Sequence, residues 1–544
     1  MNAKDLAGLA ATLFQKKGPL NSLHQEIAEN FYPERADFTV SRSIGADFAS
    51  NLMSSFPVIC RRDLGNQIGS MLRPKARPWF HLKRKFSEKD ADDTEVRAHL
   101  EWFEQVQRRA MYDPAAMFTR ATKEGDHDFA AFGQACISVE PNKNADGLLF
   151  RAWHLRDLAW QENSEGQIGF VCRKWKTTLQ VLAGTFGKDK LHPELQKDVD
   201  NKPFDEHEVM HMVMDAEMYD ENPKGRPRWS IWWDQKYSVV IEATPIWGKH
   251  YIIPRWSLIG SQYAYSPAVV AALPDARLIQ AMAFTMLEVG EKAARPPLIA
   301  TADAIRSDVA AYAGGITWVD QEYDERLGEV LRPISQDFRG INYGMQMLQD
   351  TRMMIKEAFF LNKLTPFNPT SDPQMTAFQA GQIVQEYIRN ALPIFEPMEQ
   401  EYNAALCEET FNLMMRHGAF GSPLDWPSAM RGMEIEFQFE SPLNDVIDQQ
   451  KGQKWLEAKA LLADAIALDP STRHVVKAGT ALRDALSGVG VPAGWLNTEA
   501  EVSKMIEQDQ QQQQSAQILS AMQQGATVAR DLAGAQKDMA QTQI

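Results

Sequence analysis

Two histidines and a glutamate in this chain have the spacing of a zinc peptidase motif. His207, Glu208 and His211 read HExxH. On a helix, this spacing puts both imidazoles on one face, where they can bind Zn²⁺ while the glutamate activates water. A third ligand is needed, a role that Glu217 could fill. Residues 208–214 also read as a strand, in which residues four apart are separated by more than about 12 Å, so zinc hydrolysis is kept only as an alternative.

A tryptophan-rich segment over residues 208–256 is the second candidate for chemistry. Its aromatic side chains lie among β-branched residues and turn formers, which predicts a small β-rich module. Such rings can form a sugar-binding platform, but more often they form the core of the module or a contact between subunits. The candidate docking and subunit-contact residues are Arg226, Arg228, Trp229, Trp232, Trp233 and Trp247.

No other enzyme signature is complete in the sequence. Residues 184–189, GTFGKD, lack the glycine spacing and the Ser or Thr of a phosphate-binding loop. A nucleophile elbow and a dinucleotide-binding fingerprint are also missing from the sequence. These enzyme classes are therefore not supported by the sequence.

Length and charge narrow the functional classes. The chain has 544 residues, which predicts about three or four domains or one large composite body. Its formal charge of -15, from 57 Lys and Arg against 72 Asp and Glu, disfavours tight non-specific binding of duplex DNA over the whole surface. Any contact with DNA has to be local.

The cysteines and the apolar runs bear on the compartment. The four cysteines form no CxxC pair, which argues against a zinc knuckle or a disulfide framework and fits a reducing compartment. No run approaches the roughly 18 apolar residues of a membrane-spanning helix, and the N-terminus lacks the apolar core of a signal peptide. We expect neither membrane insertion nor secretion.

Hydrophobic periodicity divides the chain into elements. It predicts helices over residues 21–72 with two breaks, 92–131, 176–199, 266–293 and 344–364, an extended segment over 71–85, and strands over 133–139, 148–153 and 433–439. Helix 266–293 should pack lengthwise against a neighbour, because one stripe of it holds Ile279, Met282, Met286 and Val289.

The last third is predicted to be mostly helical. Residues 365–374, TPFNPTSDPQ, should form an exposed loop because they contain three prolines. Residues 376–417 should be helical with breaks at Pro393 and Pro397, and Gly418 can end this helix in the left-handed conformation. The alanine-rich and glutamine-rich residues 441–544 should also form helices.

In this order, the parts resemble a phage portal protein. The closer resemblance, over about residues 20–505, is to the head-to-tail connector family of short-tailed phages. The early patterns that carry it are Tyr32-Pro33-Glu34-Arg35, Leu72-Arg73-Pro74, Arg77-Pro78-Trp79-Phe80-His81-Leu82 and Phe132-Gly133-Gln134-Ala135-Cys136. The later ones are Pro254-Arg255-Trp256, Tyr265-Ser266-Pro267, Arg295-Pro296-Pro297-Leu298, Met375-Thr376-Ala377 and Glu440-Ser441-Pro442-Leu443.

This resemblance implies a mixed α/β, mostly α, portal fold that assembles as a ring around a central channel. The implied parts are N-terminal helices and an α/β wing (1–175), a stem helix (176–199), a β-rich clip (200–264) and a second stem helix (265–293). They continue with wing (294–340), tunnel helix and tunnel loop (341–375), wing or crown-proximal helices and a strand (376–440) and a helical crown or barrel (441–544).

The resemblance also implies a structural role without catalysis, cofactor or metal ion. The protein would form a dodecameric ring at one capsid vertex of the virion, after assembly in the host cytoplasm, and double-stranded DNA would be packaged and ejected through it. Its partners would be further copies of itself, major capsid and scaffolding proteins, the terminase large subunit, tail adaptor or nozzle proteins, and internal core or ejection proteins. The residues facing DNA would be Lys356, Asn362, Lys363, Thr365, Asn368 and Thr370. A zinc peptidase and a carbohydrate-binding tail component are the alternatives.

Overall fold

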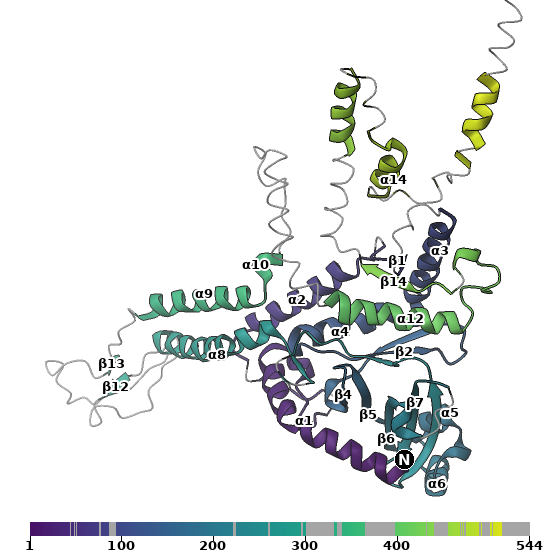
Figure 1. Ribbon diagram of the computed structural model, residues 1–544. Helices are drawn as coiled ribbons and strands as arrows, with labels where there is room; N and C mark the ends of the chain where they lie inside the picture. Colours follow the sequence, from purple (N-terminus) through teal and green to yellow (C-terminus); the bar gives the residue numbers. More distant parts are fainter. Residues whose placement is uncertain are drawn as a thin grey trace, which may run out of the picture. The chain divides into compact units, whose positions relative to one another are not determined.

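The computed structural model describes residues 1–75, 78–85, 94–220, 225–294, 298–300, 331–333, 340–364 and 398–439, apart from single positions within them, and parts of 455–513. The chain divides into two compact units, and Figure 1 labels their helices and strands. The first contains residues 1–76 and 110–413, and the second contains residues 77–109 and 414–544. Each unit therefore joins segments that are far apart in the sequence.

A five-stranded antiparallel sheet lies at the centre of the first unit. Its strand order is β4-β5-β6-β7-β8, from β4 (Leu158–Glu162), β5 (Ile168–Thr178), β6 (Glu206–Asp215), β7 (Arg228–Asp234) and β8 (Val239–Ile246). Strands β5 and β6 pair from Phe170 opposite Met214 to Thr178 opposite Glu206. Because side chains alternate along a strand, this register gives the sheet two apolar faces.

Helices cover both of these faces. On one face, Leu6, Ala10 and Leu13 of α1 (Ala3–Phe31) pack with Met212 and neighbouring side chains of the sheet. On the other face, Val209 packs with side chains of α5 (Leu179–Phe186) and α6 (Pro193–Asn201). The sheet is thus buried within one chain.

The first unit also contains smaller sheets and further helices. A three-stranded sheet has the order β3-β2-β9, from β2 (Ile137–Pro141), β3 (Leu148–Ala152) and β9 (Tyr251–Ile252). Two short pairs are β10 (Ser257–Leu258) with β11 (Ala264–Tyr265) and β12 (Leu298–Ala300) with β13 (Leu331–Pro333). The other helices are α2 (Phe56–Leu72), α4 (Phe118–Phe132), α7 (Ala216–Tyr219), α8 (Pro267–Ala294), α9 (Gly340–Ala358), α10 (Leu361–Leu364) and α12 (Ala405–Arg416), the last preceded by a π-helical turn, η7 (Glu399–Ala404).

The second unit contains another two-stranded pairing. Strand β1 (Phe80–Arg84) pairs antiparallel with β14 (Ile435–Phe439), with Phe80 opposite Phe439. Phe103 of α3 (Thr94–Met111) lies with its ring centroid 4.7 Å from that of Phe420. Helix α14 (Ala478–Gly488) belongs to the same unit.

The predicted helix over residues 176–199 is wrong. Strand β5 continues to Thr178, because Cys172 and its neighbours pair with β6 inside the sheet. Helix α5 then ends before Gly187, whose φ of 90° no regular helix adopts, and α6 starts at Pro193. Both short helices pack on the sheet through leucines and Phe186.

The predicted β-rich module exists only in part. Its strands β6, β7 and β8 are present, but they continue the same sheet as β4 and β5, and β9 pairs with β2. Residues 200–264 are therefore not a separate module.

Several other predicted elements are confirmed. Helix α2 starts at Phe56-Pro57, and β2, β3 and β14 lie at the predicted positions. Helix α8 begins after Ser266, as predicted, and continues through Pro274. Gly418 has a φ of 74° at the end of α12, as predicted. Residues 365–374 and most of 376–397 lie outside the described residues.

Candidate functional site

The HExxH residues lie on strand β6 and cannot share one metal ion as they do on a helix. His207 and His211 point to the same face of the strand but are about 13 Å apart along it. His207 Nε2 lies 2.7 Å from Asp234 Oδ2, and His211 Nε2 lies 2.8 Å from Ser230 Oγ. Within the described parts of the chain, no group of three metal-ligating side chains converges.

His211 belongs to a buried polar cluster between the two larger sheets. Its Nδ1 contacts the Tyr251 hydroxyl, which accepts a hydrogen bond of 2.7 Å from Arg173 Nε. The imidazole stacks on Trp232 with a centroid distance of 4.0 Å. Burial lowers the pKa of His211 well below its usual value, and His250 and Arg173 add to this shift. A neutral, enclosed imidazole of this kind holds strands together and has no access to substrate.

The candidate docking residues divide into buried and exposed ones. Trp229 and Trp233 are fully buried in the sheet core, and Trp232 packs against Trp175 and Phe186. The Trp229 and Trp233 rings are therefore not available to a sugar or to another protein, whereas Trp232 is half-buried. Arg226 donates a hydrogen bond to the carbonyl oxygen of Pro245. Arg228 forms an ion pair with Asp215 and donates a hydrogen bond to the carbonyl oxygen of Ile168. Trp247 is exposed.

The candidate DNA-facing residues are only partly described. Lys356 is exposed on α9, close to where Ile355 and Phe359 anchor this helix by burial. Asn362 is exposed on α10. The side chain of Lys363 and all of Thr365, Asn368 and Thr370 lie outside the described residues, so the structure describes only two side chains of this set.

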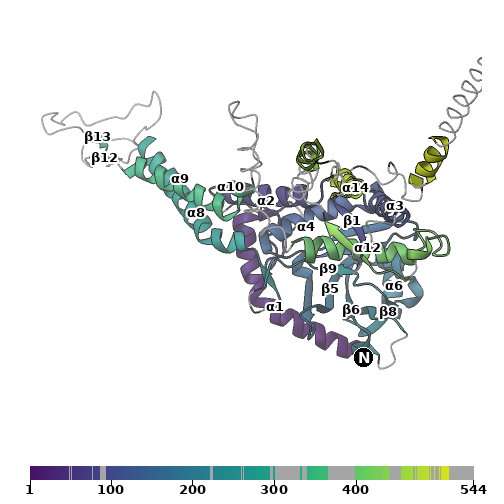
Figure 2. The same cartoon turned by 45° about the horizontal axis from the view of Figure 1, so that its top comes forward.

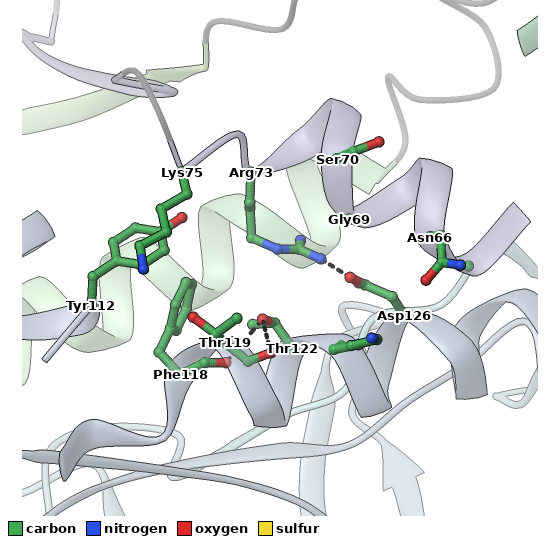
Figure 3. Close-up of a pocket in the computed structure, with 12 residues that line it drawn as sticks. Asn66, Gly69, Ser70, Arg73, Lys75, Tyr112, Phe118, Thr119, Thr122 and Asp126 are labelled. Atoms are coloured by element: carbon green, nitrogen blue, oxygen red, sulfur yellow. Dashed lines mark hydrogen bonds and ion pairs between the residues drawn. The ribbon is translucent and has the colours of Figure 1, made fainter. Parts of the chain in front are cut away.

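One pocket of the first unit contains a buried ion pair that the sequence did not reveal. The cavity has a volume of about 200 Å³, and helices α2 and α4 supply most of its walls (Figure 3). Arg73 pairs with Asp126 at its floor, and Asn403 Oδ1 accepts a second hydrogen bond of 2.7 Å from Arg73. Burial raises the pKa of the Asp126 carboxyl, and Arg73 offsets part of the shift. Because the guanidinium is already matched, the pair stabilises the helices and provides no free charge for a ligand.

Helices α8 and α9 form a two-helix pair within the first unit. They lie side by side in both views (Figures 1 and 2). The predicted stripe of α8 faces this partner: Ile279 is buried, Met282, Met286 and Val289 are half-buried, and Met286 approaches Gly344 so closely that a Cβ there would lie 3.0 Å from its sulfur. The prediction that α8 packs lengthwise against a neighbour is confirmed.

Each helix of this pair has a second apolar face, which is exposed. The exposed fractions are 53% for Phe284 and 57% for Leu287 on α8, and 68% for Tyr343 and 59% for Met354 on α9. Met345, Met347 and Met353 are also exposed on α9. Phe284 and Leu287 lie opposite the first stripe of α8, and Tyr343, Met347 and Met354 share one side of α9. We call these five residues the outer face of the pair. The sequence contained this signal as apolar residues at helical spacing outside the first stripe, and our sequence analysis missed it.

Helix α8 also changes one expectation about membranes. Among the described residues, it is the helix long and apolar enough to cross a membrane by length and composition, and 28% of that segment is buried. The prediction that no segment has this length and composition is therefore wrong.

A family comparison bears on the whole chain. The family model described as "Bacteriophage head to tail connecting protein" matches residues 3–496. Two similar proteins are the "Probable portal protein" of Bordetella phage BPP-1 and the "Portal protein" of Salmonella phage epsilon15. The first is 24% identical over 430 residues, which are 77% of this chain and 75% of the relative. The second is 20% identical over 395 residues, which are 70% of this chain and 68% of the relative.

Among solved structures, the similarity is looser. The chain resembles one from "Virion of native gene transfer agent (GTA) particle" at 9% identity and a TM-score of 0.36, covering 75% of this chain and 86% of that one. A chain from "Neck of empty GTA particle computed with C6 symmetry" matches at 9% identity and a TM-score of 0.33, covering 74% and 89%. Scores this low add nothing to the assignment, which rests on the family match.

Proposed function

The chain belongs to the family of bacteriophage head to tail connecting proteins, a structural and not an enzymatic family, and from this premise we propose that twelve copies form a closed ring at one capsid vertex. As a portal protein it is a component of the virion at the connection between head and tail. In the proposed ring, double-stranded DNA passes through the channel during packaging and ejection. The observation that supports ring formation best is the exposed outer face of the α8–α9 pair.

The outer face has the properties of a contact between copies. A helix that is apolar on two sides is normally packed on two sides, and here one side is covered by the partner helix and the other is exposed. Phe284 and Leu287 lie on α8, whereas Tyr343 and Met354 lie on α9, so the α8 side of one copy can pack on the α9 side of the next. Contacts between two different surfaces generate a ring when the rotation between neighbouring copies closes.

Charges on the pair favour a protein neighbour over a lipid bilayer. The last two turns of α8 carry Glu288, Glu291 and Lys292, and Glu288 pairs with Lys292 at 2.7 Å. The adjacent helix α9 exposes four further charged residues, namely Asp350, Arg352, Lys356 and Glu357. Each charge at the centre of a bilayer costs about 2.5–3.5 kcal/mol, which outweighs the gain from burying one apolar side chain.

The positions of the portal parts are revised in this proposal. The α8–α9 pair is the stem, because β5 ends at Thr178 and the helices α5 and α6 that follow are short and pack on the five-stranded sheet. The end that receives terminase, and later a tail adaptor, is the 295–339 connection between α8 and α9, where β12 pairs with β13. This replaces residues 200–264, whose strands β6, β7 and β8 continue the five-stranded sheet and whose strand β9 pairs with β2. Lys356, Asn362, Lys363, Thr365, Asn368 and Thr370 remain the proposed DNA-facing residues.

Substitution of the outer face tests this proposal. Phe284→Ser with Leu287→Ser removes about 3 kcal/mol or more of apolar burial from each contact between copies, which is about a hundredfold in the association constant. We expect native mass spectrometry to show rings for the wild type and mainly monomers for the double variant, with unchanged circular dichroism. Val181 is an exposed apolar residue of α5, so Val181→Ser serves as the matched control, and this variant should still form rings. Rings of normal size from the double variant would contradict the role given to α8.

A further inference from the structure

The π-helical turn η7 (Glu399–Ala404) is an unusual element at an unusual position. It runs directly into α12 with no break, and both of its flanking residues have ordinary right-handed helical conformations. A π-turn inside a helix contains one residue more than the α-helical path requires, and it persists only where surrounding contacts hold it. The contacts around η7 show what holds it.

On one side, two carboxylates of this helix bind the same short segment of the chain. Glu401 Oε2 accepts a hydrogen bond of 3.0 Å from the backbone N–H of Arg255, and Glu401 Oε1 lies 3.4 Å from Arg255 Nη2. Glu409 accepts hydrogen bonds from the backbone N–H groups of Lys249, at 2.9 Å, and His250, at 3.2 Å. Gly248 makes room for Glu409, since a Cβ there would lie 1.8 Å from its Oε1.

On the other side, two consecutive residues enter the buried Arg73 cluster. Asn403 accepts from Arg73 and donates to the carbonyl oxygen of Leu72 at 3.3 Å. Tyr402 lies under the Arg73 guanidinium at 4.4 Å and donates to the carbonyl oxygen of Thr122 at 3.5 Å. Both side chains are essentially inaccessible to solvent.

Helix geometry links these contacts to the extra residue. At about 100° per residue, the eight steps from Glu401 to Glu409 would leave the two carboxylates about 80° apart around a regular α-helix. With one residue taken up by the π-turn, the path is equivalent to seven steps, and the offset falls to about 20°. The π-turn is therefore what allows both carboxylates to reach residues 249–255.

We propose that η7 is a one-residue register switch, in which release of the contacts of Glu401, Tyr402 and Asn403 lets the turn relax to an α-helix and rotates Met398 by about 100° relative to α12. Arg255 is suited to act as the release point, because it also pairs with Glu162 and donates to the carbonyl oxygen of Gly166 at 3.2 Å. A movement of the β4–β5 turn would thus be passed to helix η7–α12. The use of this switch in the virion rests on the proposed function, whereas its existence does not.

A deletion tests the geometry. Removing Ala404 leaves seven α-helical steps between Glu401 and Glu409, so we expect both contacts to survive in a regular helix. Hydrogen exchange over residues 399–408 should slow by about tenfold or more, and exchange over 249–256 should stay slow. Deletion of Asn412, an exposed residue of α12 outside the turn, is the control and should lower the Tm clearly. Faster exchange in both segments after deletion of Ala404 would overturn the register argument.

A substitution tests the release. Glu401→Ala should slow exchange over residues 399–404, because the turn relaxes to an α-helix, and should accelerate exchange over 249–256. Acceleration in both segments would show that η7 has no alternative register, and the switch would be rejected.

The role in the virion is tested with particles that carry the Ala404 deletion as their only copy of the protein. We expect normal rings in native mass spectrometry but at least a tenfold loss of infectious particles. Normal rings with wild-type infectivity would show that the switch is not used. Absence of rings for the wild type itself would instead contradict the proposed function.

Discussion

At the scale of single residues, helix α1 carries two buried ionisable groups without a carboxylate at hydrogen-bond distance among the described residues. Lys17 Nζ donates to the carbonyl oxygens of Leu155 and Leu158 and lies 5.5 Å from the ring centroid of Trp160. His24 lies between Phe38 and Phe132, and neither of its ring nitrogens has a hydrogen-bond partner within the described chain. Both positions make the stability of the first unit depend on pH.

Lys17 should stabilise the fold more at alkaline pH. Burial lowers its pKa to about 7, whereas the unfolded chain has the ordinary lysine value near 10.5. Between these values the unfolded state binds the proton and the folded state does not, so the free energy of unfolding rises with pH. Lys17→Met should remove this rise when urea unfolding is compared at pH 7 and pH 9. An equal rise in both proteins would contradict the assignment.

His24 should destabilise the fold in acid. Burial lowers its pKa well below 6.5, and Lys17 and His154 add to the shift. Below pH 6.5 the unfolded chain takes up a proton that the folded chain excludes, so stability is lost as the pH falls. His24→Leu should lose less Tm than the wild type between pH 7 and pH 5. Exposed His417→Leu is the control, and an identical acid loss in all three proteins would refute this role.

At the scale of elements, glycines set how closely α4 packs. A Cβ at Gly125 would lie 2.8 Å from the Tyr402 hydroxyl and 3.0 Å from Ile137 Cδ1, both of which are buried. Gly125→Ala should therefore lower the free energy of unfolding by about 1–3 kcal/mol. Gly184→Ala is the matched control on α5, where no atom lies within 4 Å, and it should raise the free energy of unfolding by about 0.5–1 kcal/mol. Equal effects of both substitutions would contradict the packing at Gly125.

Sequence patterns predicted elements well where one periodicity dominates. The stripe of α8 and the strands β2, β3 and β14 were found because each has one clear apolar face. The prediction failed at residues 176–199, where β5 changes into α5 at Thr178 without a turn residue between them. We missed the second apolar stripe of α8 because the first stripe was sufficient to predict that this helix packs against one neighbouring helix.

The candidate sites were harder to predict than the elements. The HExxH spacing has its chemical meaning only on a helix, and the strand partners that enclose His211, such as Tyr251 and Ser230, come from other parts of the chain. The Arg73 cluster was not predicted for the same reason. Arg73 and Asp126 are 53 residues apart in the sequence, and Asn403 is more than 270 residues from either of them. Contacts over such distances in sequence leave no periodic signal.

At the scale of the whole molecule, long-range pairing defines both units. Strands β1 and β14 form one sheet although most of the first unit lies between them in sequence. The order of short patterns along the chain, and not any single pattern, indicated the family, and the family match over residues 3–496 confirms that resemblance. The wing, stem and clip boundaries are not fixed by this match, and the α8–α9 pair provides the physical basis for revising them.

The assembly state of the wild-type protein tests the central claim most directly. Native mass spectrometry and electron microscope images of the same sample would count the copies and show whether they enclose a channel. The proposed function predicts a ring of about twelve copies with an axial hole, held by contacts between outer faces. A protein that stays monomeric at all concentrations and salt conditions, with the outer face of α8 and α9 still exposed, would contradict it.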